Sequence, residues 1–408
     1  MLDKSVIKIL VLDDEPFMLK LLNCVLVNLG YTQITTCDSG HSALEWIDCP
    51  NDPPDLILLD LNMPVMDGVE FMRHLVYRRY IGCLILVSGE DERMLQTAER
   101  LARAHNISAL GHLRKPVNPG DLSALLAKWI PPCLSKHQAA DKVYGANEVR
   151  IAILSGELVN YYQPKVDVAS GKVVGVESLV RWRHPQDGMV FPDRFIGVAE
   201  EHGLIDDLTR AVVGVAFAQA KTWQDNGLHL RVAVNISMDN LATLEFADYM
   251  VAAASVAGIA PDSIVLEVTE SRLMNELSGP LEILTRLRLK RFSLSIDDFG
   301  TGHSSLSQLR DIPFDELKID RGFVHGASSN DTLRAIYDAS LGLAKQLGMK
   351  TVAEGVEDRA DWDFLRTTGC ELAQGYFIAK PMPASEIPGW ISAWEANVEN
   401  LMGSSDAS

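Results

Sequence analysis

The stretch FSLSIDDFGTGHSSLSQLRDIPFDELKID, residues 292–320, holds two short apolar runs that each lead into acidic side chains. The first run, FSLSIDDF, carries Asp297 and Asp298 near its end, and the second, ELKID, carries Lys318 and ends with Asp320. Runs of this length between polar segments indicate strands that are buried in a parallel sheet. The stretch therefore predicts two successive strands with charged side chains at or near their carboxyl ends.

Similar runs recur on both sides of this stretch, with helical patterns between them. Eight strand candidates fall between residues 146 and 397, a length of about 250 residues that is typical of a TIM (β/α)8 barrel. The first two flank Ser170-Gly171, a hairpin-like turn, so we expect that pair to be antiparallel. The candidates are VNYYQPKVDV (159–168), VVGVESLVRW (173–182), LRVAVNIS (230–237), SIVLEVTE (263–270), FSLSIDDF (292–299), ELKID (316–320), KTVAEGV (350–356) and LAQGYFI (372–378).

Polar residues stand in or at the ends of these runs, one set after another. The spacings are 32 residues from Asn235 to Glu267, then 30 to Asp297, 23 to Asp320, 34 to Glu354 and 20 to Gln374. Each spacing fits one βα unit. Side chains at the carboxyl ends of barrel strands meet at the barrel mouth, where such enzymes carry out their chemistry. The set comprises Glu177, Asn235, Glu267, Asp297, Asp298, Lys318, Asp320, Glu354 and Gln374.

A ring with this many carboxylates needs counter-charge. Two divalent cations would supply it, and a metal pair about 3.5–4 Å apart can activate water and stabilise the oxygens of a phosphate ester. The alternative is that these acids are merely exposed residues at strand ends. VLEVTE (265–270) and VAEGVE (352–357) speak against that alternative, because they place acids inside apolar runs, where an unpaired charge is unfavourable.

The first 130 residues alternate apolar runs with amphipathic stretches. IKILVLDD (7–14), DLILLD (55–60) and CLILVSG (83–89) indicate buried parallel strands, and FMLKLLNCVLVNLG (17–30) and DGVEFMRHLVYRR (67–79) indicate helices. This order predicts a doubly wound α/β domain, whose ligands bind at the carboxyl ends of the strands.

Those strand ends carry acids, a hydroxyl and an amine. Asp13 and Asp14 close one strand, Asp60 closes the next, Ser88 another, and Lys115 follows a fourth candidate, SALGHL. Three carboxylates at one edge suit Mg²⁺, which also takes phosphate oxygens and waters. A hydroxyl and an ammonium group beside them suit a phosphoryl group. The alternative, solvated or helix-capping acids, explains single residues better than the whole set.

The domain boundaries follow from composition. Residues 1–130 form the first domain, 131–147 a linker with two prolines, 148–397 the barrel, and 398–408 a flexible tail. No apolar run approaches the roughly 18 residues that span a bilayer. The apolar run at the N-terminus lacks the cleavage site of a signal peptide and is interpreted as a strand.

Charge and cysteine usage restrict the partners. The net charge of −18 argues against broad electrostatic binding to nucleic acid or an anionic membrane. No helix-turn-helix with a basic face is evident, so we expect no DNA binding. The six cysteines are scattered without a CxxC pair, which favours reduced thiols in a cytoplasmic protein.

Residues 5–128 resemble the receiver domain of two-component response regulators, with a flavodoxin-like sheet. The resemblance rests on Asp13-Asp14, Asp60 within DLNMPVMDG, Ser88 and Lys115-Pro116. It implies that Asp60 accepts phosphate from a histidine kinase or phosphotransfer protein. Mg²⁺ would be held by Asp14, Asp60 and the backbone of Asn62, with Asp13 in the same metal and phosphate group, and Ser88 and Lys115 would bind the phosphoryl oxygens. The family usually has Tyr or Phe where this chain has His112, three residues before the lysine.

The barrel segment resembles the EAL domain, which degrades cyclic di-GMP. The family's Glu-Ala-Leu signature stands here as Glu177-Ser178-Leu179. Other family motifs span nearly the whole segment: YYQPKVD, ESLVRWRHP, FIGVAEEHGLI, NIS, LEVTE, IDDFGTGHSSLSQL, LKID, VAEGVE and QGYFIAKPM.

The resemblance also implies a role for each matching residue. Lys318 would hold the nucleophilic water, Glu354 would act as general base or partner of the second metal, and Glu270 would anchor the loop DDFGTGHSS (297–305), where His303 replaces the usual Tyr. The implied metal ligands are Glu177, Asn235, Glu267, Asp297, Asp298 and Asp320. The implied substrate-binding residues are Gln163, Leu179, Arg181 and Gln374, the last near the ions.

The implied reaction is hydrolysis of one 3′–5′ phosphodiester of cyclic di-GMP to linear pGpG, with two Mg²⁺ or Mn²⁺ ions per EAL site. Two alternatives stay open: a catalytically weak cyclic di-GMP receptor or interaction module, and a two-metal phosphodiesterase with another substrate. The two domains together suggest that phosphorylation of the receiver controls turnover. The resemblance further implies a homodimer or a higher even-numbered oligomer and a bacterial origin.

Overall fold

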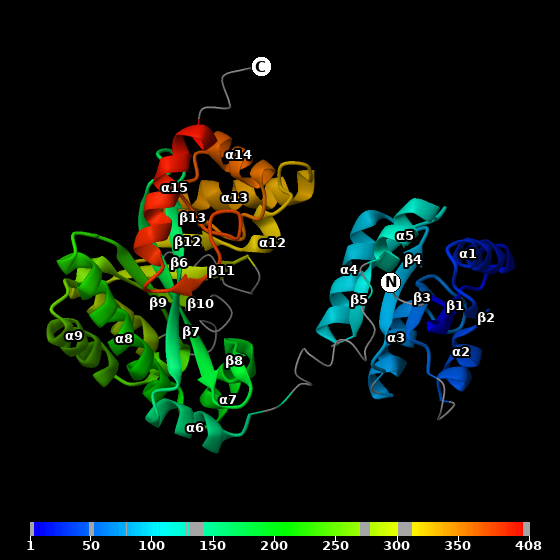
Figure 1. Ribbon diagram of the computed structural model, residues 1–408, viewed down its shortest axis with the longest axis horizontal. Helices are drawn as coiled ribbons and strands as arrows, with labels where there is room; N and C mark the ends of the chain where they lie inside the picture. The colour runs from blue at the N-terminus through cyan, green and yellow to red at the C-terminus, as the bar shows by residue number, and fades with distance from the viewer. Residues whose placement is uncertain are drawn as a thin grey trace. The chain divides into compact units, whose positions relative to one another are not determined.

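The computed structural model describes two compact units. They comprise Met1–Asp141 and Lys142–Ser408, and each is considered by itself (Figure 1). Glu270, His303, most of the predicted linker and the last part of the predicted tail lie outside the described residues. The described residues are 4–48, 53–78, 80–105, 107–127, 129, 142, 144–269, 278–300 and 312–402.

The first unit is a parallel sheet of five strands in the order β2-β1-β3-β4-β5. This flavodoxin-like arrangement confirms the predicted doubly wound fold. Its strands are β1 (Lys8–Leu12), β2 (Gln33–Cys37), β3 (Leu56–Asp60), β4 (Cys83–Ser88) and β5 (Ser108–Arg114). Its helices are α1 (Pro16–Asn28), α2 (Gly40–Ile47), α3 (Gly68–Tyr77), α4 (Glu92–Ala104) and α5 (Pro119–Ala127), with a 3-10 turn at Lys4–Val6.

Two hydrophobic cores hold the helices against the two faces of this sheet. Phe71 of α3 and Leu95 of α4 belong to one core, and Leu22 of α1 and Leu122 of α5 belong to the other. Strand β2 was not among the predicted strands. It forms the edge of the sheet, its sequence QITTC is polar and partly exposed, and it therefore lacks the apolar run that marks a central strand.

The second unit is a closed barrel of eight strands. Neighbours follow the order β6-β14-β13-β12-β11-β10-β9-β7, and β6 pairs with β7 to close the ring. Strand β6 is antiparallel to both of its barrel neighbours, as the Ser-Gly turn predicted for β6 and β7, whereas the other pairs are parallel. The barrel strands are β6 (Leu158–Asp167), β7 (Val173–His184), β9 (Arg231–Ile236), β10 (Ile264–Thr269), β11 (Ser293–Phe299), β12 (Glu316–Ile319), β13 (Lys350–Ala353) and β14 (Leu372–Ala373).

Helices surround these strands, as Figure 1 shows in the green-to-red part of the chain. Two short strands, β8 (Gly188–Val190) and β15 (Met382–Pro383), extend the sheet beside β7 and β6. The helices are α6 (Ala146–Leu154), α7 (Ile196–Glu201), α8 (Ile205–Asp225), α9 (Glu245–Ala257), α10 (Ser278–Leu289), α12 (Arg321–Val324), α13 (Asp331–Leu347), α14 (Arg359–Thr368) and α15 (Ile387–Met402), with 3-10 turns at Pro192–Arg194, Met238–Ala242 and Pro261–Ser263. None of the described helices is long and apolar enough to cross a membrane.

The core of the barrel unit lies between the strands and the helices. Val232 and Val234 of β9, for example, pack with Phe217 of α8 in one large cluster. Because side chains alternate along a strand, Ala233 and Asn235 point into the barrel instead. The outer faces of the strands are therefore apolar, while the inner faces can carry the polar residues of a site.

The ends of this unit differ from the predicted boundaries. Tyr144, in the predicted linker, packs its ring 4.6 Å from that of Trp182, so the barrel unit begins before residue 148. Helix α15 continues to Met402, past the predicted start of the tail at residue 398. The reason is packing, because the Val398 side chain lies directly against Gly171. A methyl group added to Gly171 would be only 2.8 Å from Val398 Cγ1.

Candidate active site

The ammonium group of Lys318 lies inside the barrel among four carboxylates. The side chain is only 1% exposed, so the charge depends on these partners and not on water. Its Nζ lies 2.7 Å from Glu354 Oε1, 3.0 Å from Asp297 Oδ1, 3.1 Å from Glu267 Oε2 and 3.5 Å from Glu177 Oε2. The four acids come from, or directly follow, four different barrel strands.

Strand register explains this convergence. Glu267 of β10 lies opposite Asn235 of β9, and Glu177 of β7 lies opposite Gln163 of β6. Side chains at paired positions of neighbouring strands share one face of the sheet. In a closed barrel that face is the interior, so residues up to about two hundred positions apart reach one point.

A network of amides holds Glu177 in place. Asn235 Nδ2 donates to Glu177 Oε1 at 2.8 Å, and Gln374 Nε2 donates to Glu177 Oε2 at 2.7 Å. The same Gln374 nitrogen is 2.9 Å from Gln163 Oε1, and Gln163 in turn donates to the carbonyl of Ala379 at 2.9 Å. The four predicted residues among these five are therefore connected directly.

Lys165 is a second buried cation, which the sequence analysis did not single out. Its Nζ lies 2.5 Å from Glu267 Oε1, and the residue is 4% exposed. One signal could have found it: Lys165 follows Gln163 by two positions in an apolar strand, which places both side chains on the inner face. A charge at such a position requires a buried partner.

Two groups of three carboxylates share Asp297. Oxygens of Glu177, Glu267 and Asp297 lie within 4.8 Å of one another, and so do oxygens of Asp297, Asp298 and Glu354. Carboxylate oxygens, with the amide oxygen of a residue such as Asn235, are the donors that hard divalent cations prefer. This donor set, with Asp297 common to both groups, therefore fits divalent cations.

The backbone helps to turn both consecutive aspartates toward this cluster. Successive residues of a regular strand face opposite sides. Strand β11 breaks that rule, since its register against β12 shifts between Ile296 and Phe299 and Asp298 has a φ of 56°. An irregularity of this kind re-aims a side chain next to a site.

Three further predicted residues lie around the carboxylates. Asp320 is in neither oxygen group; it caps α12 by accepting a hydrogen bond from the Gly322 nitrogen at 2.8 Å. Arg181 donates to the carbonyl of Val180 at 2.8 Å, and its guanidinium lies over the Phe191 ring. The third, Leu179, lines the cavity at the mouth.

A cavity of about 220 Å³ opens beside these acids. Leu179, Gln163, Glu177, Glu354 and Gln374 contribute to its wall, as do five residues that the sequence analysis did not select. The cavity wall is therefore acidic where it meets the carboxylate cluster, and Tyr376 gives it one aromatic side chain. The five additional residues are Arg321, Gly355, Glu357, Gly375 and Tyr376.

Electrostatics keep part of the site charged. Burial alone would lower the pKa of the Lys318 ammonium, but the surrounding carboxylates, Asp297 foremost, raise it well above its usual range. Burial would raise the pKa of Glu177, but the ammonium groups of Lys318 and Lys165 outweigh it and hold that pKa well below its usual range. Lys318 and Glu177 therefore stay ionised at neutral pH.

The remaining acids behave in the opposite way. Burial, with the charge of Glu177, raises the pKa of Glu267 to about 7, and burial, with the charge of Asp297, raises the pKa of Asp298 to about 6. Burial also raises the pKa of Glu354, despite its contact with Lys318. Without metal, the site therefore holds protons near neutral pH that a cation would displace.

The first unit gathers its predicted residues at one edge of the sheet. Lys115 Nζ lies 2.8 Å from Asp13 Oδ2 and 2.8 Å from Asp60 Oδ2. Oxygens of Asp13, Asp14 and Asp60 lie within 4.8 Å of one another, which fits a single Mg²⁺. Burial raises the pKa of Asp60 against the opposing effect of Lys115.

Backbone groups complete that edge. The Asn62 N–H donates to Asp60 Oδ1 at 3.2 Å. Ser88 is fully buried, and its Oγ accepts a hydrogen bond from the Glu90 nitrogen at 3.3 Å. The hydroxyl thus ends β4 one strand away from Asp60, at the edge where the sequence predicted it.

His112 stands in place of an aromatic residue and ties β5 to α4. Its Nδ1 lies 2.7 Å from Glu99 Oε2, and its Nε2 lies 2.7 Å from Glu92 Oε1. Burial alone would lower the pKa of His112, but the two carboxylates outweigh that effect and raise it. The two contacts therefore stabilise the protonated imidazole relative to the neutral one.

Comparisons with known proteins agree with both sites. The EAL domain model matches residues 146–381, and the response regulator receiver domain model matches residues 9–127. The cyclic di-GMP phosphodiesterase RocR of Pseudomonas aeruginosa is 31% identical over 379 residues, covering 92% of this chain and 96% of RocR. The cyclic di-GMP phosphodiesterase NbdA of the same organism is 40% identical over 258 residues, which are 63% of this chain but only 33% of NbdA.

Solved structures match the barrel unit. The PaMucR phosphodiesterase in complex with c-di-GMP has a TM-score of 0.57 at 40% identity, covering 59% of this chain and 98% of that one. An EAL domain protein from Listeria monocytogenes EGD-e has a TM-score of 0.55 at 28% identity, covering 62% and 99%. The barrel, its buried acids and these matches together show that the chain belongs to the EAL domain family, with a response regulator receiver domain preceding the EAL domain.

Proposed function

We propose that this protein hydrolyses cyclic di-GMP to linear pGpG with two divalent cations, Mg²⁺ or Mn²⁺, bound at the barrel mouth. The main support for the proposal is the set of carboxylate oxygens around Lys318, which form two groups that share Asp297. The bound ions would supply neutralising charge and an activated water. RocR and NbdA, which are cyclic di-GMP phosphodiesterases, support the choice of substrate.

The chain's own residues would bind and orient the substrate. Lys318 keeps its charge and can hold the attacking water or neutralise charge that develops on the phosphate oxygens. Glu354, whose Oε1 lies 2.7 Å from Lys318 Nζ, would accept a proton from that water. The proposed substrate-binding residues Gln163, Leu179 and Gln374 line the cavity, and Arg181 lies on the same strand as Leu179.

The test is pGpG production by the purified full-length protein with Mg²⁺ and cyclic di-GMP. Wild type should turn over, and Glu177→Gln and Glu354→Gln should each lower kcat by at least about a hundredfold, because each removes a charge beside the reacting atoms. Glu395→Gln, on α15, is the matched control. Binding of cyclic di-GMP without turnover would favour the receptor alternative, and turnover of a different cyclic dinucleotide only would favour another substrate.

We also propose that phosphorylation of Asp60 controls this activity. Asp60 would accept phosphate from a histidine kinase or phosphotransfer protein, with Mg²⁺ held by the acidic edge and the phosphoryl oxygens held by Ser88 and Lys115. The pairing of Lys115 with Asp13 and Asp60 supports that assignment. A phosphodonor should change the hydrolysis rate of wild type and not that of Asp60→Ala; an equal response in both would contradict the coupling.

Assembly and location belong to the same proposal. We expect a homodimer or a higher even-numbered oligomer in the bacterial cytoplasm, where thiols such as that of buried Cys370 remain reduced. Sedimentation analysis of the full-length chain tests the assembly, and a stable monomer at micromolar concentration would contradict it.

A further inference from the structure

One buried carboxylate joins two turns beside the cavity. Asp361 of α14 is 1% exposed, and its Oδ1 accepts a hydrogen bond from the Gly326 nitrogen at 3.0 Å. Its Oδ2 accepts from the Glu357 nitrogen at 3.0 Å and from His325 Nδ1 at 2.8 Å. Gly326 and His325 follow α12, whereas Glu357 follows β13, so Asp361 connects two segments that are distant in sequence.

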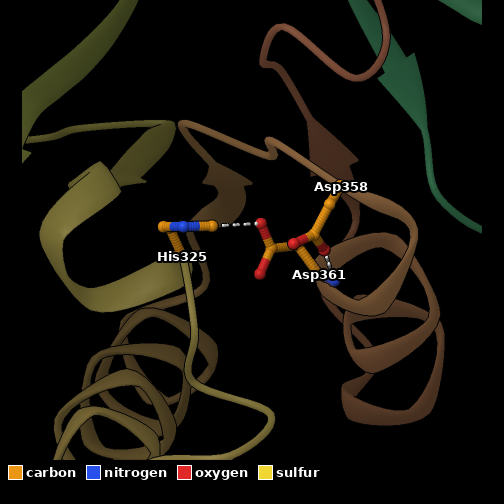
Figure 2. A group of neighbouring side chains, drawn as sticks. All are labelled: His325, Asp358 and Asp361. Carbon is orange, nitrogen blue, oxygen red and sulfur yellow. Dashed lines mark hydrogen bonds and ion pairs between the residues drawn. The ribbon is translucent and has the colours of Figure 1, made fainter. Parts of the chain in front are cut away.

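Figure 2 shows that His325 and Asp361 point at each other, while the Asp358 carboxylate turns toward the start of α14. Asp358 caps that helix by accepting a hydrogen bond from the Asp361 nitrogen at 2.9 Å. Both oxygens of Asp361 already have partners within the protein. His325, Asp358 and Asp361 thus form a hydrogen-bonded joint. In a metal site, by contrast, the carboxylate oxygens would be available to bind a cation.

The segment that this joint holds carries the proposed general base. Residues 354–357 begin with Glu354, which lies 2.7 Å from Lys318, and end with Glu357, whose nitrogen donates to Asp361. The first part of the segment is held by the barrel, because the Glu354 nitrogen donates to the Ile319 carbonyl at 3.1 Å. Glu357 instead contacts Arg321 of α12, His325 just after that helix and Asp361 of α14.

The same segment contacts the cavity wall on the side of α12. The Arg321 side chain lies against Gly355, where an added methyl group would be 2.2 Å from Arg321 Cγ. Its guanidinium makes an ion pair with Glu357 Oε1, and both residues line the cavity. A shift of α12 relative to residues 354–357 would therefore move Glu354 and reshape the wall together.

We propose that His325 and Asp361 are positioning residues that lock α12 against residues 354–357, and so fix the Glu354 carboxylate and the Arg321–Glu357 pair for the bound dinucleotide. This inference rests on the proposed function. Neither residue touches the substrate cavity, and each acts through the segment it holds. Without the His325 ring, the buried Asp361 carboxylate would accept hydrogen bonds from backbone nitrogens alone. Because the acceptor is a carboxylate, the hydrogen bond from His325 is charge-assisted.

The test uses steady-state hydrolysis of cyclic di-GMP by the full-length protein with Mg²⁺. His325→Ala should lower kcat about tenfold, since a small misplacement of a reacting group is enough for such a loss. His325→Asn keeps a nitrogen donor close to the position of Nδ1 and should restore at least half of the wild-type kcat. Asp361→Asn, which replaces an acceptor by a donor, should lower kcat at least as far as His325→Ala.

Asp363→Asn is the matched control, because Asp363 lies on the same helix but faces solvent, where it pairs with Arg359. It should leave kcat and the dissociation constant of cyclic di-GMP unchanged. Equal kcat values for His325→Ala and Asp363→Asn would overturn the proposal. So would failure of His325→Asn to exceed His325→Ala, because the effect would then come from the ring and not from the hydrogen bond.

A second readout separates this inference from the proposed function. The dissociation constant of cyclic di-GMP, measured with Ca²⁺ by calorimetry, reports the cavity wall without turnover. His325→Ala should raise it about threefold through the Arg321–Glu357 pair, and His325→Asn should restore it. If wild type binds without hydrolysing, the proposed function fails, and an unchanged dissociation constant in His325→Ala would then overturn the positioning role as well.

Discussion

Both units place a lysine among carboxylates at the carboxyl ends of parallel strands, but they do so to different depths. Lys115 of the receiver unit is 17% exposed and pairs with Asp13 and Asp60. Lys318 of the barrel unit is 1% exposed and lies within reach of four carboxylates. One of these four, Glu267, also pairs with Lys165. The same pair of residue types therefore serves two unlike environments.

The difference between the two sites is one of depth. At the receiver edge the partly exposed ammonium of Lys115 faces Asp13 and Asp60, with Asp14 beside them. In the barrel, the acids outnumber the ammonium groups of Lys318 and Lys165, and burial keeps water from screening the excess. Because screening by water weakens charge interactions, we expect the buried barrel site to hold cations more strongly than the partly exposed receiver edge.

The largest expected effect comes from removing the deeper lysine. Lys318→Met should lower kcat for cyclic di-GMP about a thousandfold, the size of loss found when a group that stabilises developing charge is removed. The rate of pGpG formation at saturating Mg²⁺ measures it. Lys290→Met, an exposed lysine that follows α10, is the control. A Lys318→Met variant with more than a tenth of the wild-type rate would place this ammonium outside the reaction.

The corresponding change in the receiver should be milder. Lys115→Met leaves Asp13 and Asp60 facing each other without a cation and should destabilise the unit by about 2 kcal/mol, less than the loss of a fully buried partner because Lys115 is partly exposed. Millimolar Mg²⁺ should recover most of it, since a cation can replace the ammonium. Thermal unfolding with and without Mg²⁺ measures this, with Lys20→Met on α1 as the control. A Mg²⁺ response equal to that of wild type would contradict the exchange.

The smallest expected effect is a pH dependence of metal binding in the barrel. Because the pKa of Glu267 is raised to about 7, a cation must displace its proton at pH 6 but not at pH 8. Mg²⁺ affinity should therefore rise about tenfold over that interval, the change in the ionised fraction of one such group. Calorimetric titration at both pH values measures it, and an affinity that is flat or falls with pH would contradict it.

The same raised pKa determines how the free energy of unfolding of the metal-free protein changes with pH. Folding raises the pKa of Glu267 from its usual 4.5 to about 7, so the folded state binds the proton more tightly than the unfolded state. Its stabilising contribution is complete below pH 4.5 and is lost as the pH rises to about 7. Added Mg²⁺ should thus raise the melting temperature more at pH 8 than at pH 6.

Much of the fold could be predicted because its strands are apolar and regularly spaced. All eight barrel strands begin near the predicted places, although the last is only Leu372–Ala373 where residues 372–378 were predicted, and the Ser-Gly turn indicated the antiparallel pair. Strand β2 was missed, because an edge strand such as QITTC buries little and has no apolar run to mark it. The boundaries at Tyr144 and Val398 shifted for a related reason: both residues pack against partners that no local pattern reveals.

Local periodicity and the position of a charge within an apolar run are enough to predict the buried strands and the acids at their ends. Which of those side chains meet depends on the tertiary structure. Gln374 reaches Gln163 across 211 positions, Lys165 reaches Glu267 across 102, and His325, just after α12, reaches Asp361 of α14. Such contacts depend on strand register and barrel closure, which set distances in space that spacing along the chain does not encode.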